Sequence, residues 1–171
     1  MNKFKLTAFS ALAISIFSLL IVSCEKPLDR DENVFTKTGI PMTGSQVVPA
    51  NASAATGTLD IIYVRGEHTL SYTINWSGLS GPPANITTPA QVAGPAIGVY
   101  GPASPGFMSP VAPLQSITTG FTAATSGTYK GSLLIDNVYV KEVDLLNNKF
   151  YIMIKTAAFP AGQLRGQVDF R

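Results

Sequence analysis

The chain has 171 residues, with 12 basic and 10 acidic side chains and a net charge of +2 at neutral pH. Charged residues make up only 13% of it and form no basic cluster, so nucleic acid is not expected as a partner. A single cysteine excludes an intramolecular disulfide, and a single histidine leaves no basis for a Ser-His or Cys-His catalytic pair.

Residues 1–23 are predicted to be an export signal. Lys3 and Lys5 form a positive start, and "LTAFSALAISIFSLLIV" forms the apolar core. This core is short for a membrane-spanning helix and ends without a basic stop-transfer cluster, so we expect it to be cleaved. Removing its two lysines leaves ten basic and ten acidic residues in the mature chain.

Cys24 follows directly in "LIVSC", which resembles the lipobox of bacterial lipoproteins. The resemblance implies a diacylglyceryl group on the thiol, cleavage before Cys24 and acylation, for example by palmitate, of the new amino terminus. Two or three acyl chains hold a protein firmly on a membrane. We therefore expect a lipid-anchored protein of a Gram-negative envelope, at the outer membrane, on its periplasmic or surface face. The alternative is an unpaired cysteine after an ordinary signal.

Residues 24–37 carry charges without a core periodicity, so they are predicted to be a flexible tether behind the lipidated terminus. The "DRDE" within them resembles surface-export signals of some Gram-negative groups, and a plain solvated linker explains it equally well.

Residues 38–171 are predicted to form one all-β domain, because apolar and polar residues alternate with period two. "GTLDIIYVR" and "HTLSYTINW" each place apolar side chains on one face, and the short "GEH" between them indicates a hairpin. "YKGSLLIDNVYVKEVDLL" predicts one or two further strands with a break near Asp136 and Asn137. "NNK" predicts a turn, and "FPAG" is expected to reverse the chain in a closing hairpin. Such strands predict an antiparallel sandwich or barrel.

Between Ser77 and Ser126 the alternation fails in a long segment rich in proline and glycine. Proline removes ladder donors, so we expect irregular structure here, either a functional loop or a segment packed on the sandwich. Its apolar residues argue against simple disorder.

Several stretches together resemble the CHRD domain, a module named after chordin and common in bacterial secreted proteins. They are "TGSQVVPA", "LSYTINWSGLSG", "AGPAIGVYGP" and, most specifically, "YIMIKTAAFPAGQLRGQV". The resemblance covers nearly the whole mature domain and implies an immunoglobulin-like β-sandwich or barrel.

The resemblance also exposes departures. The family's middle motif reads approximately Ala-His-Ile-His-Gly-Pro-Ala, whereas "AQVAGPA" places Gln91 and Ala93 at the histidine positions. A third histidine position holds Lys155, and a glutamate position holds Gln163. If three histidines bind a metal in the family, this chain lacks them, so we expect neither a metal nor another cofactor. The one remaining histidine, His68, is expected to be solvated in a turn.

The polar residues Lys155, Gln163, Arg165 and Gln167 are predicted to lie on the outward faces of the closing hairpin, within reach of one another. Arg165 suits a bidentate contact with a carboxylate. That carboxylate is either internal, from Asp60, Glu142 or Asp144, or belongs to a ligand.

Taken together, these features predict a non-catalytic binding or structural module. An envelope glycan or protein would be reached through residues 81–113 or the open face of the closing hairpin. Trp76, Tyr100 and Phe107 are the first aromatic candidates for contact, with core packing as the alternative for each and the favoured one for Trp76. The rival hypotheses are a metal-dependent enzyme with unrecognised ligands and a purely architectural envelope protein.

Overall fold

The structure is a computed structural model that describes residues 33–84, 97–101, 115–117, 119–138 and 140–171. Cys24, Gln91, Ala93 and Phe107 lie outside these ranges. The predicted signal and lipidation site, and two of the three substituted family positions, therefore lie outside the described residues.

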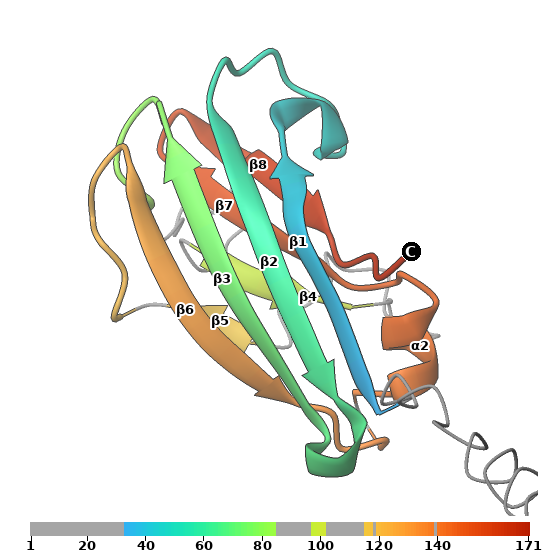
Figure 1. Cartoon of the computed structure of the whole chain (residues 1–171). Coiled ribbons are helices and arrows are strands. Elements are labelled where there is room, and N and C mark those ends of the chain that lie inside the picture. The colour runs from blue at the N-terminus through green and yellow to red at the C-terminus, as the bar shows by residue number, and fades with distance from the viewer. Residues whose placement is uncertain (1–32, 85–96, 102–114, 118, 139) are drawn as a thin grey trace, which may run out of the picture. The chain divides into compact units, whose positions relative to one another are not determined.

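The first sheet has four antiparallel strands in the order β1-β2-β3-β6 (Figure 1). Short 3₁₀ turns follow the first two strands, η1 at Gly44–Gln46 and η2 at Arg65–Glu67. His68 is exposed and has the left-handed conformation that closes the β2–β3 hairpin, as the "GEH" link predicts. The strands are β1 (Val34–Met42), β2 (Thr56–Val64), β3 (Thr69–Ser77) and β6 (Gly127–Leu134).

The second sheet lies behind the first and has the order β5-β4-β7-β8 (Figure 1). Its strands are β4 (Ile97–Tyr100), β5 (Gln115–Ile117), β7 (Tyr151–Thr156) and β8 (Phe159–Gln167). The two sheets meet at an isolated bridge between Thr43 and Arg165. The predicted all-β antiparallel fold is confirmed, and it is a sandwich rather than a barrel.

The core lies between the sheets and follows the predicted alternation. On β2 the buried residues are Leu59, Ile61 and Tyr63, and on β3 they are Leu70, Tyr72, Ile74 and Trp76. The second sheet supplies Ile97, Val99, Ile152, Ile154 and Leu164 to the same cluster. On β2 and β3 the buried residues alternate, because the side chains of successive residues point to opposite sides of a sheet, whereas β4 and β7 are buried on both faces.

The residues after β6 differ from the prediction. Where a second strand was one of the options, the chain makes a turn and then a short helix, α2 (Glu142–Leu146). The Asp136 carboxylate accepts hydrogen bonds from the backbone N–H groups of Val138 and Val140, and Asn137 adopts a left-handed conformation. Such side-chain to backbone bonds replace the ladder that a strand would need.

The closing hairpin is present, but the turn falls earlier than predicted. The chain reverses at residues 157–158, and "FPAG" opens the returning strand β8 instead of forming the turn. A register shift between Ile154 and Thr156 and a positive φ at Gly162 accommodate the proline. Strand β8 is an edge strand, where the missing N–H of a proline is tolerated.

Strand β1 begins at Val34, which pairs with Val64, so residues 34–37 belong to the sheet and not to the expected tether. Within the described residues, no helix is long and apolar enough to cross a membrane.

Candidate functional site

The closing hairpin places the four predicted site residues on one side of the second sheet. Lys155 lies on β7, and Gln163, Arg165 and Gln167 follow one another at alternate positions on β8. Lys155 and Gln163 are each only 1% exposed, whereas Arg165 and Gln167 are partly exposed. The expectation of an open polar face is therefore wrong for the first two residues.

Gln163 is the centre of a hydrogen-bond network inside the protein. Its Oε1 accepts from the Ser80 backbone N–H at 3.3 Å, the Ser80 hydroxyl at 3.0 Å and the Thr156 hydroxyl at 2.9 Å. Its Nε2 donates to the Ser53 hydroxyl at 2.8 Å. These bonds join β8 to the segments before β2 and after β3, so this side chain holds distant parts of the chain together.

Gln167 and Arg165 form a second connected pair. Gln167 Nε2 donates to the carbonyl oxygens of Asn148 and Phe150 at 2.6 and 2.5 Å, and its Oε1 accepts from Arg165 Nη2 at 2.9 Å. The Arg165 guanidinium also lies 3.9 Å from the centre of the Tyr151 ring. Arg165 is thus tied to an amide and an aromatic ring.

The internal carboxylates proposed as partners of Arg165 have other roles. Asp60 accepts from the Gly39 backbone N–H at 2.7 Å. Glu142 pairs with Arg65 at 2.6 Å, and Asp144 pairs with Lys149 at 2.7 Å. The predicted ion pair between Arg165 and one of these three carboxylates is therefore not found among the described residues.

Two tyrosines complete this side of the second sheet. The rings of Tyr100 and Tyr151 stack with centres 5.1 Å apart and planes 7° from parallel, and Lys155 Nζ lies 6.0 Å from the Tyr100 ring centre. Gly98 leaves room for the Tyr100 ring, because a Cβ at this position would lie 2.8 Å from Tyr100 Cε2. The two stacked rings thus lie between two cations, Lys155 and Arg165, an arrangement that the sequence does not predict. The register pairing of Tyr100 with Tyr151 accounts for the contact between the rings.

Burial changes the acid–base properties of this cluster. Desolvation lowers the pKa of the Lys155 ammonium from its ordinary value of 10.5, because burial penalises the charged form. Desolvation, with a smaller contribution from Tyr151, raises the pKa of Tyr100 to about 12. Among the described residues, Lys155 forms no ion pair and the Tyr100 hydroxyl has no hydrogen-bond partner.

The donor set is a poor fit to a transition metal. Where the family motif has a histidine, Lys155 brings an amine, and its described neighbours Tyr100 and Met153 bring a phenol and a thioether. His68 lies in the β2–β3 turn, and the described residues contain no group of three His, Cys, Asp or Glu side chains that could hold a metal. Gln91 and Ala93 lie outside the described residues, so their convergence with Lys155 stays a prediction.

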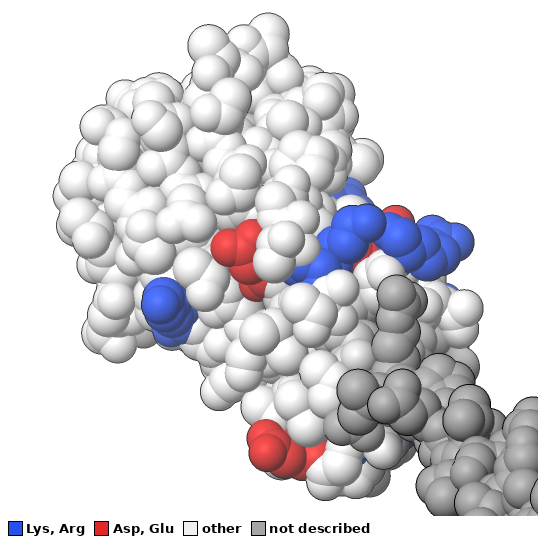
Figure 2. All heavy atoms as spheres, in the orientation of Figure 1, with Lys and Arg blue, Asp and Glu red and all other residues white. Residues whose placement is uncertain are grey.

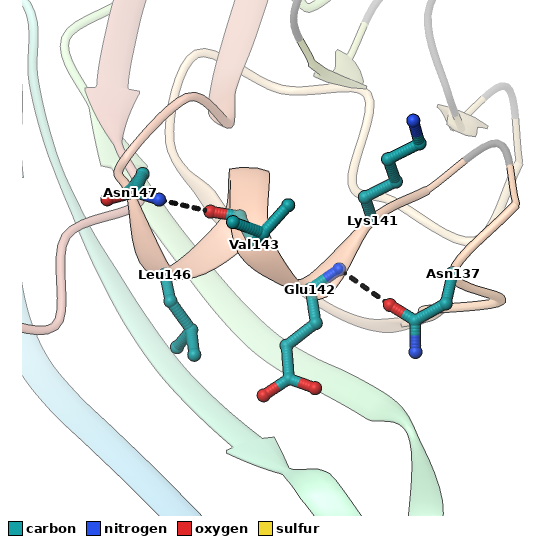
Figure 3. Close-up of a pocket in the computed structure, with 6 residues that line it drawn as sticks. All are labelled: Asn137, Lys141, Glu142, Val143, Leu146 and Asn147. Carbon is teal, nitrogen blue, oxygen red and sulfur yellow. Dashed lines mark hydrogen bonds between the residues drawn. The ribbon is translucent and has the colours of Figure 1, made fainter.

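A separate hollow of about 540 Å³ lies beside α2 (Figure 3). The Asn137 side chain accepts from the Glu142 backbone N–H at 2.9 Å, and Asn147 donates to the Val143 carbonyl at 2.7 Å. These polar groups hold the turn and the helix together and do not converge on a common point in the hollow (Figure 3).

The aromatic candidates for an exposed contact are placed differently. Trp76 and Tyr100 are 3% and 4% exposed, and the Trp76 Nε1–H donates to the Ala124 carbonyl at 3.1 Å. Core packing is therefore the correct interpretation for Trp76, and Tyr100 is also unavailable as an open contact. Phe107 lies outside the described residues.

The two-layer antiparallel sandwich defines the class of protein, and comparison with known families defines the family. The family model of the CHRD domain matches residues 38–168, which is most of the chain. The chain therefore belongs to the CHRD-domain family. Neither the curated proteins nor the solved structures contain a match.

Proposed function

We propose that the protein is a lipid-anchored, non-catalytic binding or structural module of the bacterial envelope. A CHRD domain with a β-sandwich fold fits such a module. The anchor would be the lipid on Cys24, behind the cleaved signal of residues 1–23. Membrane attachment would then come from acyl chains and not from a membrane-spanning helix.

The observation that carries the non-catalytic proposal is the use of the closing hairpin's polar groups by the fold itself. Gln163 makes four hydrogen bonds to Ser53, Ser80 and Thr156, and Gln167 bonds two backbone carbonyls and Arg165. A catalytic group needs a free acceptor or donor aimed at a substrate. These side chains instead serve the scaffold.

Membrane fractionation tests the anchor. The wild-type protein should sediment with membranes and yield an acylated amino-terminal peptide by mass spectrometry. The Cys24→Ser protein should be exported and recovered in the soluble fraction. A Cys24→Ser protein that still fractionates with membranes would contradict lipid anchoring.

Metal analysis of the purified protein tests the non-catalytic assignment against the rival metalloenzyme. After dialysis against metal-free buffer, the protein should contain substoichiometric copper and zinc, and a chelator added afterwards should leave its melting temperature unchanged. Stoichiometric metal that survives dialysis, together with a lower melting temperature after its removal, would favour the metal-dependent alternative.

A further inference from the structure

The outer face of the first sheet offers an ordered array of hydrogen-bonding groups. Strand pairing sets side chains from β2, β3 and β6 next to one another in three rows. These rows are Thr58–Asn75–Thr128, Asp60–Thr73–Lys130 and Ile62–Ser71–Ser132. All of these side chains are exposed or partly exposed, in contrast to Leu59, Ile61, Tyr72 and Ile74 at the alternate positions of β2 and β3, which are buried in the core.

A hollow of about 410 Å³ lies over the centre of these rows. Its polar lining includes Thr38, Asp60, Ser71, Thr73, Lys130 and Ser132. Gly131 also lines the hollow, and a Cβ at this position would lie 2.5 Å from the hydroxyl oxygen of Tyr72, which is buried on the core side of the sheet.

The Asp60 carboxylate is fixed at the edge of the hollow. Its Oδ1 accepts from the backbone N–H of Gly39, which lies in the bulge of β1 with a φ of +68°. Within the described part of the chain, its Oδ2 has no hydrogen-bond partner. A preset carboxylate oxygen is therefore available to accept a bond from a ligand hydroxyl.

The charge of this face is small and balanced. Asp60 and Lys130 stand on either side of Thr73, and neither forms an ion pair with another described residue. Figure 2 shows that most of the face carries no charged side chain. A polyanion would need a cluster of cations, so an uncharged ligand suits this balance better.

The pattern of donors and acceptors matches a ligand rich in hydroxyl groups. Ser and Thr hydroxyls both donate and accept, Lys130 donates, and Asp60 accepts. A sugar also presents C–H groups, for which Ile62, 44% exposed in the third row, offers an apolar contact. A protein partner would instead be expected to need an apolar centre with aromatic anchors.

We propose that the outer face of the first sheet, centred on Asp60, Thr73 and Lys130, binds neutral glycan chains. This inference rests on the proposed binding-module function and names its partner. Hydrogen bonds to an open face give a modest affinity per site. A lipid-anchored array facing a repeating polymer compensates for this through many simultaneous contacts.

The test uses the full mature protein in detergent, with insoluble cellulose, chitin and β-1,3-glucan as neutral probes and alginate as an acidic one. The wild-type protein should bind at least one neutral glycan with little dependence on salt. Thr73→Arg, which places a large cation at the centre of the face, should weaken that binding about tenfold or more. The matched control Val143→Arg adds the same side chain beside α2, where Val143 is 60% exposed, and should bind as the wild type does.

A second pair of variants removes hydrogen bonds without adding bulk. Asp60→Asn keeps an oxygen for the Gly39 N–H, and Lys130→Met keeps the length of the side chain. Each should weaken glycan binding about threefold to tenfold while leaving the circular dichroism spectrum unchanged.

The proposal would be overturned by no binding to any neutral glycan, by salt-sensitive binding to alginate alone, or by equal loss of binding in Val143→Arg. Recovery of a protein partner whose binding is abolished by Thr73→Arg would also overturn it, in favour of a protein ligand. None of these results affects the anchor and metal tests, so failure of this inference and failure of the proposed function are distinguishable.

Discussion

The outer faces of the two sheets carry polar side chains at alternate strand positions, yet they behave differently. On the first sheet, the partners of the Asn75 side chain among the described residues are its cross-strand neighbours Thr58 and Thr128, at 3.4 and 2.7 Å. On the second sheet, Gln163 is buried and reaches Ser53, which lies 110 residues away in the sequence. Polar residues on an open face are free to meet a ligand, whereas those on a covered face stabilise the fold.

The largest expected effect comes from breaking the covered face. Gln163→Leu keeps the volume of the side chain but leaves the hydroxyls of Ser53, Ser80 and Thr156 without their shared partner. We expect a loss of about 3 kcal/mol in the free energy of unfolding, because several part-buried polar groups lose their hydrogen bonds together. Thermal unfolding should show a fall in Tm of roughly 6–12 °C.

The matched control for Gln163→Leu is Ser71→Ala on the open face. Ser71 is exposed, so its removal should change the free energy of unfolding by no more than about 0.5 kcal/mol. Equal effects of the two substitutions would contradict the distinction between the faces.

The next effect concerns the buried cation. Lys155→Met removes a desolvated ammonium that has no ion-pair partner among the described residues, and we expect it to stabilise the protein by about 1–3 kcal/mol at pH 7. Denaturant unfolding of both proteins at a common pH measures the difference.

The pH dependence of Lys155→Met sharpens that prediction. The pKa of Lys155 is lower in the folded state than its ordinary 10.5, so the unfolded chain binds more protons between these two values. The free energy of unfolding of the wild-type protein should therefore contain a part that increases with pH across this window. The variant should lack this part. Measurements stay below pH 10. Above pH 10 stability falls because Tyr100, whose pKa is raised to about 12 in the folded protein, loses its proton more readily in the unfolded chain. A stability difference that is independent of pH would contradict a charged Lys155.

A smaller effect is expected at the stacked arginine. Arg165→Lys keeps the charge but loses the planar contact with Tyr151 and the geometry of the bond to Gln167, which should cost about 1 kcal/mol. A double-mutant cycle with Tyr151→Leu isolates the stacking energy. A coupling energy of zero would show that the stack contributes nothing to stability.

The smallest effect lies on the open face. Thr128→Val removes the hydroxyl that donates to Asn75 at 2.7 Å, at an exposed position. We expect a loss of about 0.5 kcal/mol or less, because water replaces the bond. A loss above about 2 kcal/mol would show that this face also has a structural role.

Two of the departures from the predicted fold, the short helix and the position of the closing turn, have local causes. α2 has five residues, of which only Leu145 is buried, so it is too short for a helical periodicity to show in the sequence. Just before this helix, the Asp136 and Asn137 side chains accept hydrogen bonds from backbone N–H groups. These bonds form only once the chain has made its turn, so the sequence pattern does not show them. Similarly, Pro160 and Gly162 indicate a change of direction, but the register shift decided that the turn falls at residues 157–158.

The candidate site was only partly predictable. The alternation on β8 correctly groups Gln163, Arg165 and Gln167 on one side of the strand. It does not show which of them are buried, because burial depends on segments far away in the sequence. The sequence does not predict a binding surface on the open face of the first sheet, because Thr, Ser and Asn at alternate positions of a strand resemble ordinary solvated residues.

The sequence by itself determined the strand content, the hairpins and the membership of the CHRD-domain family, because these depend on local alternation and on motifs of adjacent residues. Only the tertiary structure decided that Lys155 and Gln163 are buried and that Asp60, Thr73 and Lys130 stand in one exposed row. The physical reason is that strand register and the packing of one layer on another join residues that no local pattern connects.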